Sequence, residues 1–273
     1  MHVFNFLLFY PIFMSIYWIV GSIYYFFIKE KPFNRSLLVK SEHQQVEGIS
    51  FLLACYNESE TVQDTLSSVL SLEYPEKEII IINDGSSDNT AEIIYDFKKN
   101  HDFKFVDLEV NRGKANALNE GIKQASYEYV MCLDADTVID DDAPFYMIED
   151  FKKNPKLGAV TGNPRIRNKS SILGKIQTIE YASIIGCIKR SQSLAGAINT
   201  ISGVFTLFKK SALKDVGYWD TDMITEDIAV SWKLHLFDYE IKYEPRALCW
   251  MLVPETIGGL WKQRVRWAQG GHE

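Results

Sequence analysis

The stretch "GISFLLACYNESETVQDTLSSVLSLEYPEKEIIIIND", residues 48–84, contains two apolar runs of strand length with an amphipathic segment between them. The first run, 48–56, is apolar almost throughout, and the second, 77–84, is rich in isoleucine and ends in Asp84. Between the runs, apolar residues recur over 59–75 with the 3.6-residue period of a helix. This order predicts two parallel strands joined by a helix.

The same alternation continues along the chain. Because the strands are apolar throughout instead of alternating with polar residues, both faces of their sheet should be buried. The sequence therefore predicts an α/β fold with a mainly parallel sheet covered by helices on both faces. The further predicted elements are a helix at 85–100, a strand at 103–109, a helix at 113–126 and a strand at 127–134.

Polar segments follow each of the predicted strands. They read "CYNES", "NDGSSDNT", "NRGKANALNEG" and "DAD" in chain order. In parallel sheets, ligands bind outside the carboxyl ends of the strands, so these segments should form the site. No G-x-G-x-x-G follows the first strand and no G-x-x-x-x-G-K-[ST] occurs in the sequence, which argues against a dinucleotide-binding fold and a P-loop NTPase.

Asp134 and Asp136 stand two residues apart at the end of a strand, so their side chains share one face. Two carboxylates about 5 Å apart repel by roughly 3 kcal/mol at an effective dielectric constant of about 20. Mg²⁺ and Mn²⁺ take oxygen ligands, usually one or two carboxylates with phosphates and water. The pair predicts a metal site, with a solvated strand end as the alternative. The acids at 140–142 are instead expected to start a helix, whose dipole they favour.

The first 28 residues contain no Lys, Arg, Asp or Glu. A helix over 3–28 is about 39 Å long at 1.5 Å per residue, which is enough to cross a hydrocarbon core of about 30 Å. A secretory signal peptide is the alternative, but a basic leading region and a cleavage motif are missing. Four basic residues follow between 29 and 40 and only His2 precedes, so the positive-inside rule predicts a cytoplasmic location for the rest of the chain.

The composition describes a folded protein. The chain is 47% hydrophobic and 13% aromatic with a net charge of -7, so nothing in it indicates a nucleic-acid surface. The four cysteines lack C-x-x-C spacing and are expected to be reduced thiols, with neither a disulfide nor a zinc site. The expected domains are a membrane helix at 1–28, a linker at 29–47, a catalytic domain at 48–254 and an amphipathic interfacial segment at 255–273.

Six motifs in a fixed order resemble one family. "CYNES", "NDGSSDNT", "NRGKANALNEG", "DAD", "TED" at 225–227 and "QRVRW" at 263–267 are similar to the motifs of processive family 2 glycosyltransferases with the GT-A fold. That family includes synthases of cellulose, chitin, hyaluronan and poly-N-acetylglucosamine. The likeness runs from about residue 48 to residue 267 and is greatest to bacterial biofilm members, which implies polymerisation of N-acetylglucosamine from UDP-N-acetylglucosamine, with β-1,6 linkage.

The resemblance implies roles on the donor side of the reaction. It implies that a Mg²⁺ or Mn²⁺ ion is held by Asp136 with support from Asp134. Carboxylates suit ribose hydroxyls and the uracil N–H, and an ammonium at a helix start suits phosphate. The residues that the resemblance assigns to the UDP-sugar are Tyr56, Glu58, Asp84, Lys114 and Asp134.

On the acceptor side, the resemblance implies that Asp227 is the general base and that Glu226 orients it. Inverting displacement at the anomeric carbon needs a carboxylate that takes the proton of the incoming hydroxyl. A helix-terminal acid is the alternative interpretation of Asp227. By the same resemblance, the acceptor and diphosphate are lined by Ser202, Gly203, Gln263, Arg266 and Trp267.

The implied partners are a UDP-sugar donor, the growing polysaccharide, membrane lipid and a small accessory membrane subunit. Family members that also export their polymer usually continue into further membrane spans after "QRVRW", whereas this chain stops at residue 273, so we expect a truncated sequence. Three other functions stay open: another processive β-glycan synthase of the chitin, hyaluronan or cellulose type, a transferase acting on polyprenyl phosphate, and a catalytically silent UDP-sugar-binding scaffold.

Overall fold

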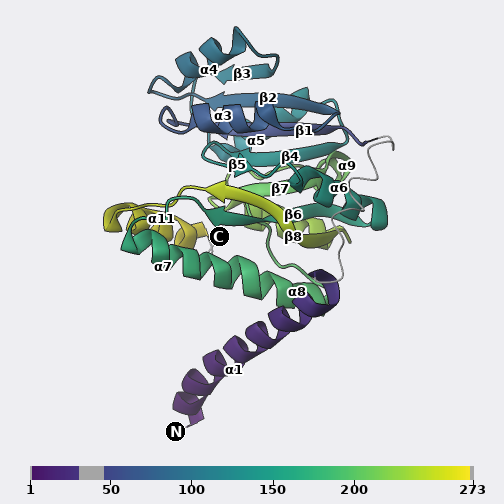
Figure 1. Cartoon of the computed structure of the whole chain (residues 1–273), viewed down its shortest axis with the longest axis vertical. Coiled ribbons are helices and arrows are strands. Elements are labelled where there is room, and N and C mark those ends of the chain that lie inside the picture. Colours follow the sequence, from purple (N-terminus) through teal and green to yellow (C-terminus); the bar gives the residue numbers. More distant parts are fainter. Residues whose placement is uncertain (1, 31–45, 271–273) are drawn as a thin grey trace.

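The computed structural model of the 273-residue chain describes residues 2–30 and 46–270. Most of the predicted linker at 29–47 lies outside the described residues, as do three of the four basic residues that follow the apolar helix and the last three residues of the interfacial segment. An eight-stranded sheet forms the centre of the molecule, in the order β3-β2-β1-β4-β7-β6-β8-β5 (Figure 1).

The first half of the sheet is the predicted parallel one. Each of its three pairings is parallel, so the carboxyl ends of these strands lie along one edge. Isoleucine and leucine side chains alternate between the two faces and are fully buried, as expected for strands covered on both sides. The strands are β1 (Ile49–Cys55), β2 (Lys77–Asp84), β3 (Lys104–Leu108) and β4 (Tyr129–Asp134).

The second half of the sheet is mixed. β7 runs antiparallel to both β4 and β6, β6 is parallel to β8, and the short β5 is antiparallel to β8. The prediction of a mainly parallel sheet is confirmed, with four parallel pairings among seven. The strands of this half are β5 (Val138–Ile139), β6 (Leu157–Ile166), β7 (Phe205–Lys209) and β8 (Glu240–Met251).

Helices cover both faces of the sheet, and each face has its own hydrophobic core. One core includes side chains of α3 (Val62–Ser71), α4 (Thr90–Lys98) and α6 (Ala143–Lys153). The other includes side chains of α5 (Lys114–Gln124), α9 (Lys210–Asp215) and α10 (Glu226–Leu236). The acids at 140–142 lie at the start of α6 as expected, with Asp142 as its N-cap residue, although they precede the first helical turn. Asp140 Oδ1 accepts the Asp142 N–H at 3.1 Å.

A long helical segment lies below the sheet in Figure 1 and connects it to the N-terminal helix. It consists of α7 (Ile172–Tyr181), the π-helical η2 (Ala182–Ile188) and α8 (Lys189–Ala195). α11 (Ile257–Gly270) lies beside α7. The N-terminal α1 (His2–Tyr25) continues through η1 (Phe26–Glu30), two residues beyond the predicted end of the span at 28.

The N-terminal helix packs on the domain with one stripe only. Ser191 Oγ of α8 donates to the Trp18 carbonyl at 2.8 Å, while most apolar side chains of α1 between 6 and 28 are exposed. In the described part of the chain, the helix at 6–30 is the one long and apolar enough to cross a membrane. The four cysteines are free thiols in the structure, and three of them are buried.

Candidate active site

The loops after β1 and β2 are joined at the carboxyl edge of the sheet. Asn57 adopts a φ of 55°, and its side-chain oxygen accepts the Ser87 N–H at 2.8 Å. The Glu58 N–H donates to Thr90 Oγ1 at 2.8 Å. These bonds hold Glu58 beside the end of β2, whereas the Tyr56 ring is exposed. The two predicted donor-side segments therefore form one continuous surface.

Asp84 holds the loop that precedes α5. The residue is 2% exposed, and its two carboxylate oxygens accept the N–H groups of Arg112 at 3.0 Å and Gly113 at 2.9 Å. Gly113 has a φ of 90°, a conformation that glycine adopts without strain. The chain turns there into α5, whose first residue is Lys114. In this structure Asp84 thus positions Lys114 through the backbone.

Lys114 joins strands and helices that are far apart in the sequence. Its ammonium donates to the Asp134 carboxylate and to the Gly203 carbonyl at 3.0 Å, and it lies 3.4 Å from Glu226 Oε1. Burial alone lowers the pKa of Lys114, but the charges of Asp134 and Glu226 outweigh it and raise that pKa. The lysine therefore stays charged between the donor-side and acceptor-side carboxylates.

Asp227 stands on the other side of Gly203. Its Oδ2 accepts the Gly203 N–H at 3.2 Å and its Oδ1 accepts the Ile228 N–H at 2.9 Å. A Cβ at position 203 would lie 3.1–3.3 Å from carboxyl-group atoms of Asp227, so a side chain there would crowd this carboxylate. Burial raises the pKa of the neighbouring Glu226, with Lys114 opposing and Asp227 reinforcing the shift. The predicted acceptor-side pair is thus placed next to Lys114.

Asp136 carries an uncompensated charge. Burial, Asp134 and Glu58 raise the pKa of Asp136 to about 7, against weaker hydrogen bonds from Leu252 and Thr137. Across 2–30 and 46–270, no ion pair includes Asp136. Burial likewise raises the pKa of Glu58. These carboxylates lie where a cation would stabilise them.

The donor set fits a metal held mostly by its substrate. The described residues contain no group of three or more His, Cys, Asp or Glu side chains that could hold a metal ion. Mg²⁺ and Mn²⁺ in phosphate-transfer sites use one or two carboxylates and take their other ligands from phosphates and water. Asp136, with Asp134 two residues before it, matches that smaller set.

α11 presents a different arginine from the predicted one. Arg264 Nη2 donates to Glu180 Oε2 of α7 at 2.6 Å, and its guanidinium lies 4.2 Å from the centre of the Trp267 ring. Arg266 is exposed, and the buried side-chain oxygen of Gln263 finds no hydrogen-bond donor among the described residues. Arg264, and not the predicted Arg266, therefore contacts α7. No feature within "QRVRW" distinguished the two arginines.

Tyr181 at the end of α7 was also missed. Burial raises its pKa to about 12, and the charges of Glu180, Asp134 and Asp136 act in the same direction while Arg264 opposes them. Tyr181 therefore lies within electrostatic range of the carboxylates at the end of β4 and of Arg264 in α11. No local pattern in the helix identifies this residue, because only the packing of α7 against the sheet edge brings it there.

Ser202 lies in the loop before β7, with its N–H donating to Thr161 Oγ1 at 2.9 Å. Of the thirteen predicted site residues, five are joined by direct contacts: Lys114, Asp134, Gly203, Glu226 and Asp227.

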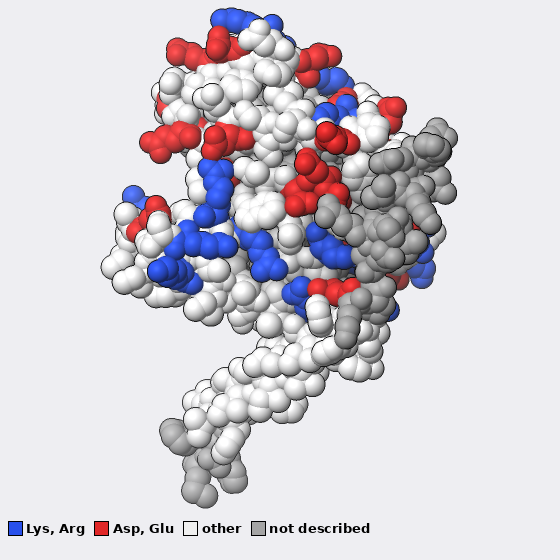
Figure 2. Space-filling model, viewed as in Figure 1, with Lys and Arg blue, Asp and Glu red and all other residues white. Residues whose placement is uncertain are grey.

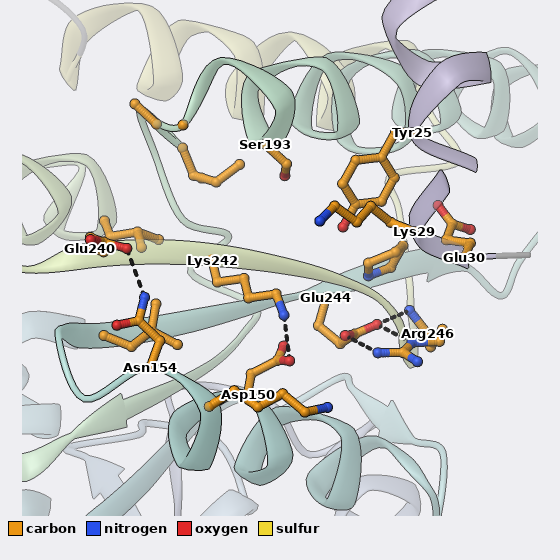
Figure 3. A pocket seen from close by; sticks show the side chains of 17 residues that line it. Tyr25, Lys29, Glu30, Asp150, Asn154, Ser193, Glu240, Lys242, Glu244 and Arg246 are labelled. Atoms are coloured by element: carbon orange, nitrogen blue, oxygen red, sulfur yellow. Dashed lines mark hydrogen bonds and ion pairs between the residues drawn. The ribbon is translucent and has the colours of Figure 1, made fainter. Parts of the chain in front are cut away.

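A cavity of about 400 Å³ opens away from this site, between the end of α1 and β8 (Figure 3). Four charged residues of its lining are paired with one another. Lys242 donates to Asp150, and Arg246 forms an ion pair with Glu244. Because the chain itself supplies these countercharges, the two carboxyl groups differ from Asp136.

The chain is similar to known proteins over most of its length. Residues 50–217 match the family model described as "Glycosyl transferase family 2". The chain is 99% identical over 273 residues to a poly-beta-1,6-N-acetyl-D-glucosamine synthase of Staphylococcus epidermidis. It is 78% identical over the same length to the synthase of that name from Staphylococcus aureus strain COL. The chain spans 66% of the length of each of these relatives.

Solved structures show the same fold. A mannosyltransferase, PcManGT from Pyrobaculum calidifontis in complex with GDP-Man and Mn²⁺, is similar with a TM-score of 0.68 and 21% identity, over 94% of this chain and 71% of that one. A fragment of S. aureus TarS in complex with UDP-GlcNAc has a TM-score of 0.59 and 19% identity, over 77% and 59%. Since the family match covers more than half of its residues, the chain belongs to glycosyl transferase family 2 and has the GT-A fold.

Proposed function

We propose that this chain is the membrane-anchored catalytic part of an inverting, metal-dependent synthase that polymerises N-acetylglucosamine from UDP-N-acetylglucosamine through β-1,6 linkages. The observation that carries the proposal is the chain of contacts Asp134–Lys114–Gly203–Asp227, which joins the donor edge to an acceptor-side carboxylate. The sugar and the linkage are supported by the name of the 99% identical relative.

On the donor side, Asp136 and Asp134 would hold Mg²⁺ or Mn²⁺ against the diphosphate. When bound, the cation stabilises the negative charge of the departing UDP. Lys114 faces the same diphosphate from the N-terminus of α5, where free N–H groups also favour phosphate. Tyr56, Glu58 and the Asp84 loop border the nucleotide. The complexes of PcManGT with Mn²⁺ and of TarS with UDP-GlcNAc support this assignment.

On the acceptor side, Asp227 takes the proton of the incoming hydroxyl. The new bond forms between that oxygen and the anomeric carbon while the bond from this carbon to the phosphate oxygen breaks, and its electron pair leaves with UDP. Two backbone N–H groups hold the Asp227 carboxylate in place before the reaction, which lowers the cost of orienting it. Attack from the face opposite the phosphate inverts the anomeric centre.

The acceptor saccharide would lie between the loop of Ser202 and Gly203 and the end of α11. Trp267 offers a partly exposed ring, 37% accessible, as a stacking surface for a sugar, and Arg264 holds that ring from one side. Gln263 supplies a buried acceptor for a hydroxyl or N–H group. Arg266 extends from the exposed side of the helix and is proposed to meet the diphosphate.

The membrane location rests on α1. Its apolar surface is exposed over a length that suits a bilayer. Figure 2 shows many Lys and Arg side chains on the part of the domain nearest α1, which suits the anionic cytoplasmic leaflet. We propose that α1 is integral to the cell membrane, that the domain is cytoplasmic, and that lipid and a small accessory membrane subunit are partners of the complete protein.

The proposal is tested with membranes that carry the complete protein. They are supplied with single UDP-sugars and a divalent metal, and the product is digested with linkage-specific hydrolases. We expect product only from UDP-N-acetylglucosamine, with cleavage by a β-1,6-specific hydrolase. A chitinase-sensitive product contradicts the linkage. A lipid-linked monosaccharide would instead identify a polyprenyl-phosphate transferase, and binding without UDP release would identify a silent scaffold.

A further inference from the structure

Lys189, the first residue of α8, is a buried lysine without an assigned role. It is 4% exposed, and its ammonium donates to the Thr200 carbonyl. Burial lowers the pKa of Lys189 to about 8, and the charge of Asp227 opposes that shift. Burying an ammonium costs several kcal/mol unless hydrogen bonds and an opposite charge compensate it. Asp227 supplies the opposite charge.

The segment held by Lys189 leads directly to the acceptor side of the site. Thr200 is three residues before Gly203, whose N–H reaches the Asp227 carboxylate. Between them, the Ile201 N–H donates to Ser231 Oγ at 3.0 Å, and Ser231 Oγ donates to the Asp227 carbonyl at 2.6 Å. These hydrogen bonds join the 200–203 loop to α10 around Asp227. The hydrogen bond from Lys189 to Thr200 joins the same loop to α8.

Two lysine ammonium groups bind main-chain carbonyls of the loop next to Asp227. Lys114 of α5 binds the Gly203 carbonyl, and Lys189 of α8 binds the Thr200 carbonyl. The other charged group next to it is Glu226 on its own helix. Lys114 is shared among Asp134, Glu226 and Asp227. The opposite charge that acts on Lys189 is that of Asp227.

α8 is itself fixed to the N-terminal helix by the two residues that follow Lys189. Arg190 donates to both carboxylate oxygens of Glu30, at 2.5 and 3.1 Å, and Ser191 donates to the Trp18 carbonyl. Three consecutive residues of α8 therefore make these contacts: Lys189 binds the 200–203 loop, and Arg190 and Ser191 bind the N-terminal helical segment. Lys189 extends from a helix whose position is set by the anchor.

We propose that Lys189 is a positioning residue of the transfer reaction, whose buried ammonium holds the 200–203 loop and so keeps the Gly203 N–H on the Asp227 carboxylate. The inference rests on the proposed function. It explains why the fold keeps a buried ammonium at this position. Loss of the ammonium should slow the proton-accepting step while leaving the nucleotide edge, formed by other residues, unchanged.

The test compares Lys189→Met, Lys189→Arg and the control Lys210→Met in membranes that carry the complete protein. Lys210 also donates to a main-chain carbonyl, that of Ala125, but lies at the start of α9. In Lys189→Met we expect kcat to fall about 10- to 100-fold, as for other misplaced reacting groups, with KM for UDP-N-acetylglucosamine within about twofold. Lys189→Arg should recover a large part of kcat, and Lys210→Met should behave like the wild type.

Melting curves separate this role from a loss of folded protein. Since Lys189→Met leaves the Thr200 carbonyl without its donor and removes a charge that offsets Asp227, its melting temperature should fall by a few degrees, and kcat is therefore compared well below the melting transition, where the variant is folded. Wild-type kcat in Lys189→Met overturns the proposal, as does a kcat in Lys189→Arg no higher than in Lys189→Met. Wild-type membranes report separately on the proposed function: absence of β-1,6 product there contradicts the synthase, whereas wild-type product with unaltered turnover in Lys189→Met contradicts only the role of Lys189.

Discussion

Asp136, which is half-buried, and Asp150, which is buried, are two carboxyl groups with opposite roles in the molecule. In both, burial is the main cause of a raised pKa and a second carboxylate adds to it, Asp134 for Asp136 and Glu244 for Asp150. Asp150 has its countercharge in the chain, because Lys242 donates to it and Arg246 neutralises Glu244 (Figure 3). A raised pKa therefore shows only that the ionised form of a carboxyl group is destabilised by its surroundings. The feature that indicates a place for an external cation is that Asp136, unlike Asp150, forms no ion pair among the described residues.

The largest effect on the transfer rate is expected when Asp227, the proposed general base, is replaced. Asp227→Asn should lower transfer by about 10²- to 10⁴-fold, because the amide cannot take the proton of the acceptor hydroxyl. Binding of UDP and Mn²⁺ should stay nearly intact, measured by calorimetry beside a UDP-release assay. The matched control is Asp150→Asn, which changes a carboxyl outside the site and should retain transfer. Full activity in Asp227→Asn would remove the proposed base.

The comparison is tested directly by replacing Asp136. Asp136→Ala should weaken metal-dependent binding of UDP by about 10- to 100-fold, because one carboxylate ligand of the cation is lost. Titration of UDP with and without Mn²⁺ measures this effect. Asp150→Ala should keep the wild-type dependence on Mn²⁺. If both variants respond alike, the distinction between the two carboxyls is wrong.

A smaller effect is expected on stability in the absence of metal. The pKa of Asp136 in the fold, about 7, lies above the value of about 3.9 in an unfolded chain. Its contribution to stability is thus complete below about pH 4 and is lost as the pH rises through about 7. At pH 8 without metal, Asp136→Asn should be more stable than the wild type by about 2 kcal/mol, converting part of that shift.

Melting curves at pH 5 and pH 8 in a chelator measure this difference. Adding Mn²⁺ and UDP should raise the melting temperature of the wild type and of Asp150→Asn, but much less that of Asp136→Asn, because only bound ligand stabilises the fold. A wild-type curve that is insensitive to pH between 5 and 8 while Asp136→Asn is no more stable contradicts the assignment.

The smallest effect concerns the ion pair beside the cavity. Glu30 and Arg190 side chains are 15% and 14% exposed, so their pair is only partly screened by water. Glu30→Gln should lower the free energy of unfolding by about 1 kcal/mol, since it removes a charge-assisted pair and keeps the shape. The dependence of UDP binding on Mn²⁺ should not change. A change in the dependence on Mn²⁺ would show that the cavity is coupled to the active site, and would contradict the distinction between Asp136 and Asp150.

Several site residues could be predicted because they lie at the ends of elements. Asp84 and Asp134 end apolar strands, Lys114 begins a helix after a glycine, and Asp227 stands at the start of α10. Strand and helix periods locate such ends from local sequence alone. The structure changes the detail at Asp84, which binds the loop before Lys114 with both oxygens.

Other residues could not be predicted because their contacts are made across the chain. Gly203 meets Lys114, 89 positions away, only because β7 enters the sheet antiparallel beside β4. Arg264, and not Arg266, reaches α7 because the rotation of α11 follows from its packing. Tyr181 and Lys189 stand in a helical run outside the six motifs, and only the course of that helix below the sheet places them near the carboxylates.

The sequence by itself determined the parallel half-sheet, its polar edge and the apolar helix before it, because strand burial, helix period and membrane length are local properties of side chains. The tertiary structure alone decided which carboxyl group has a cation within the chain and which does not. Asp136 and Asp150 are both aspartates near a second acid in the fold. What separates them is whether a distant strand brings a lysine close, and that depends on the packing of β8 against α6.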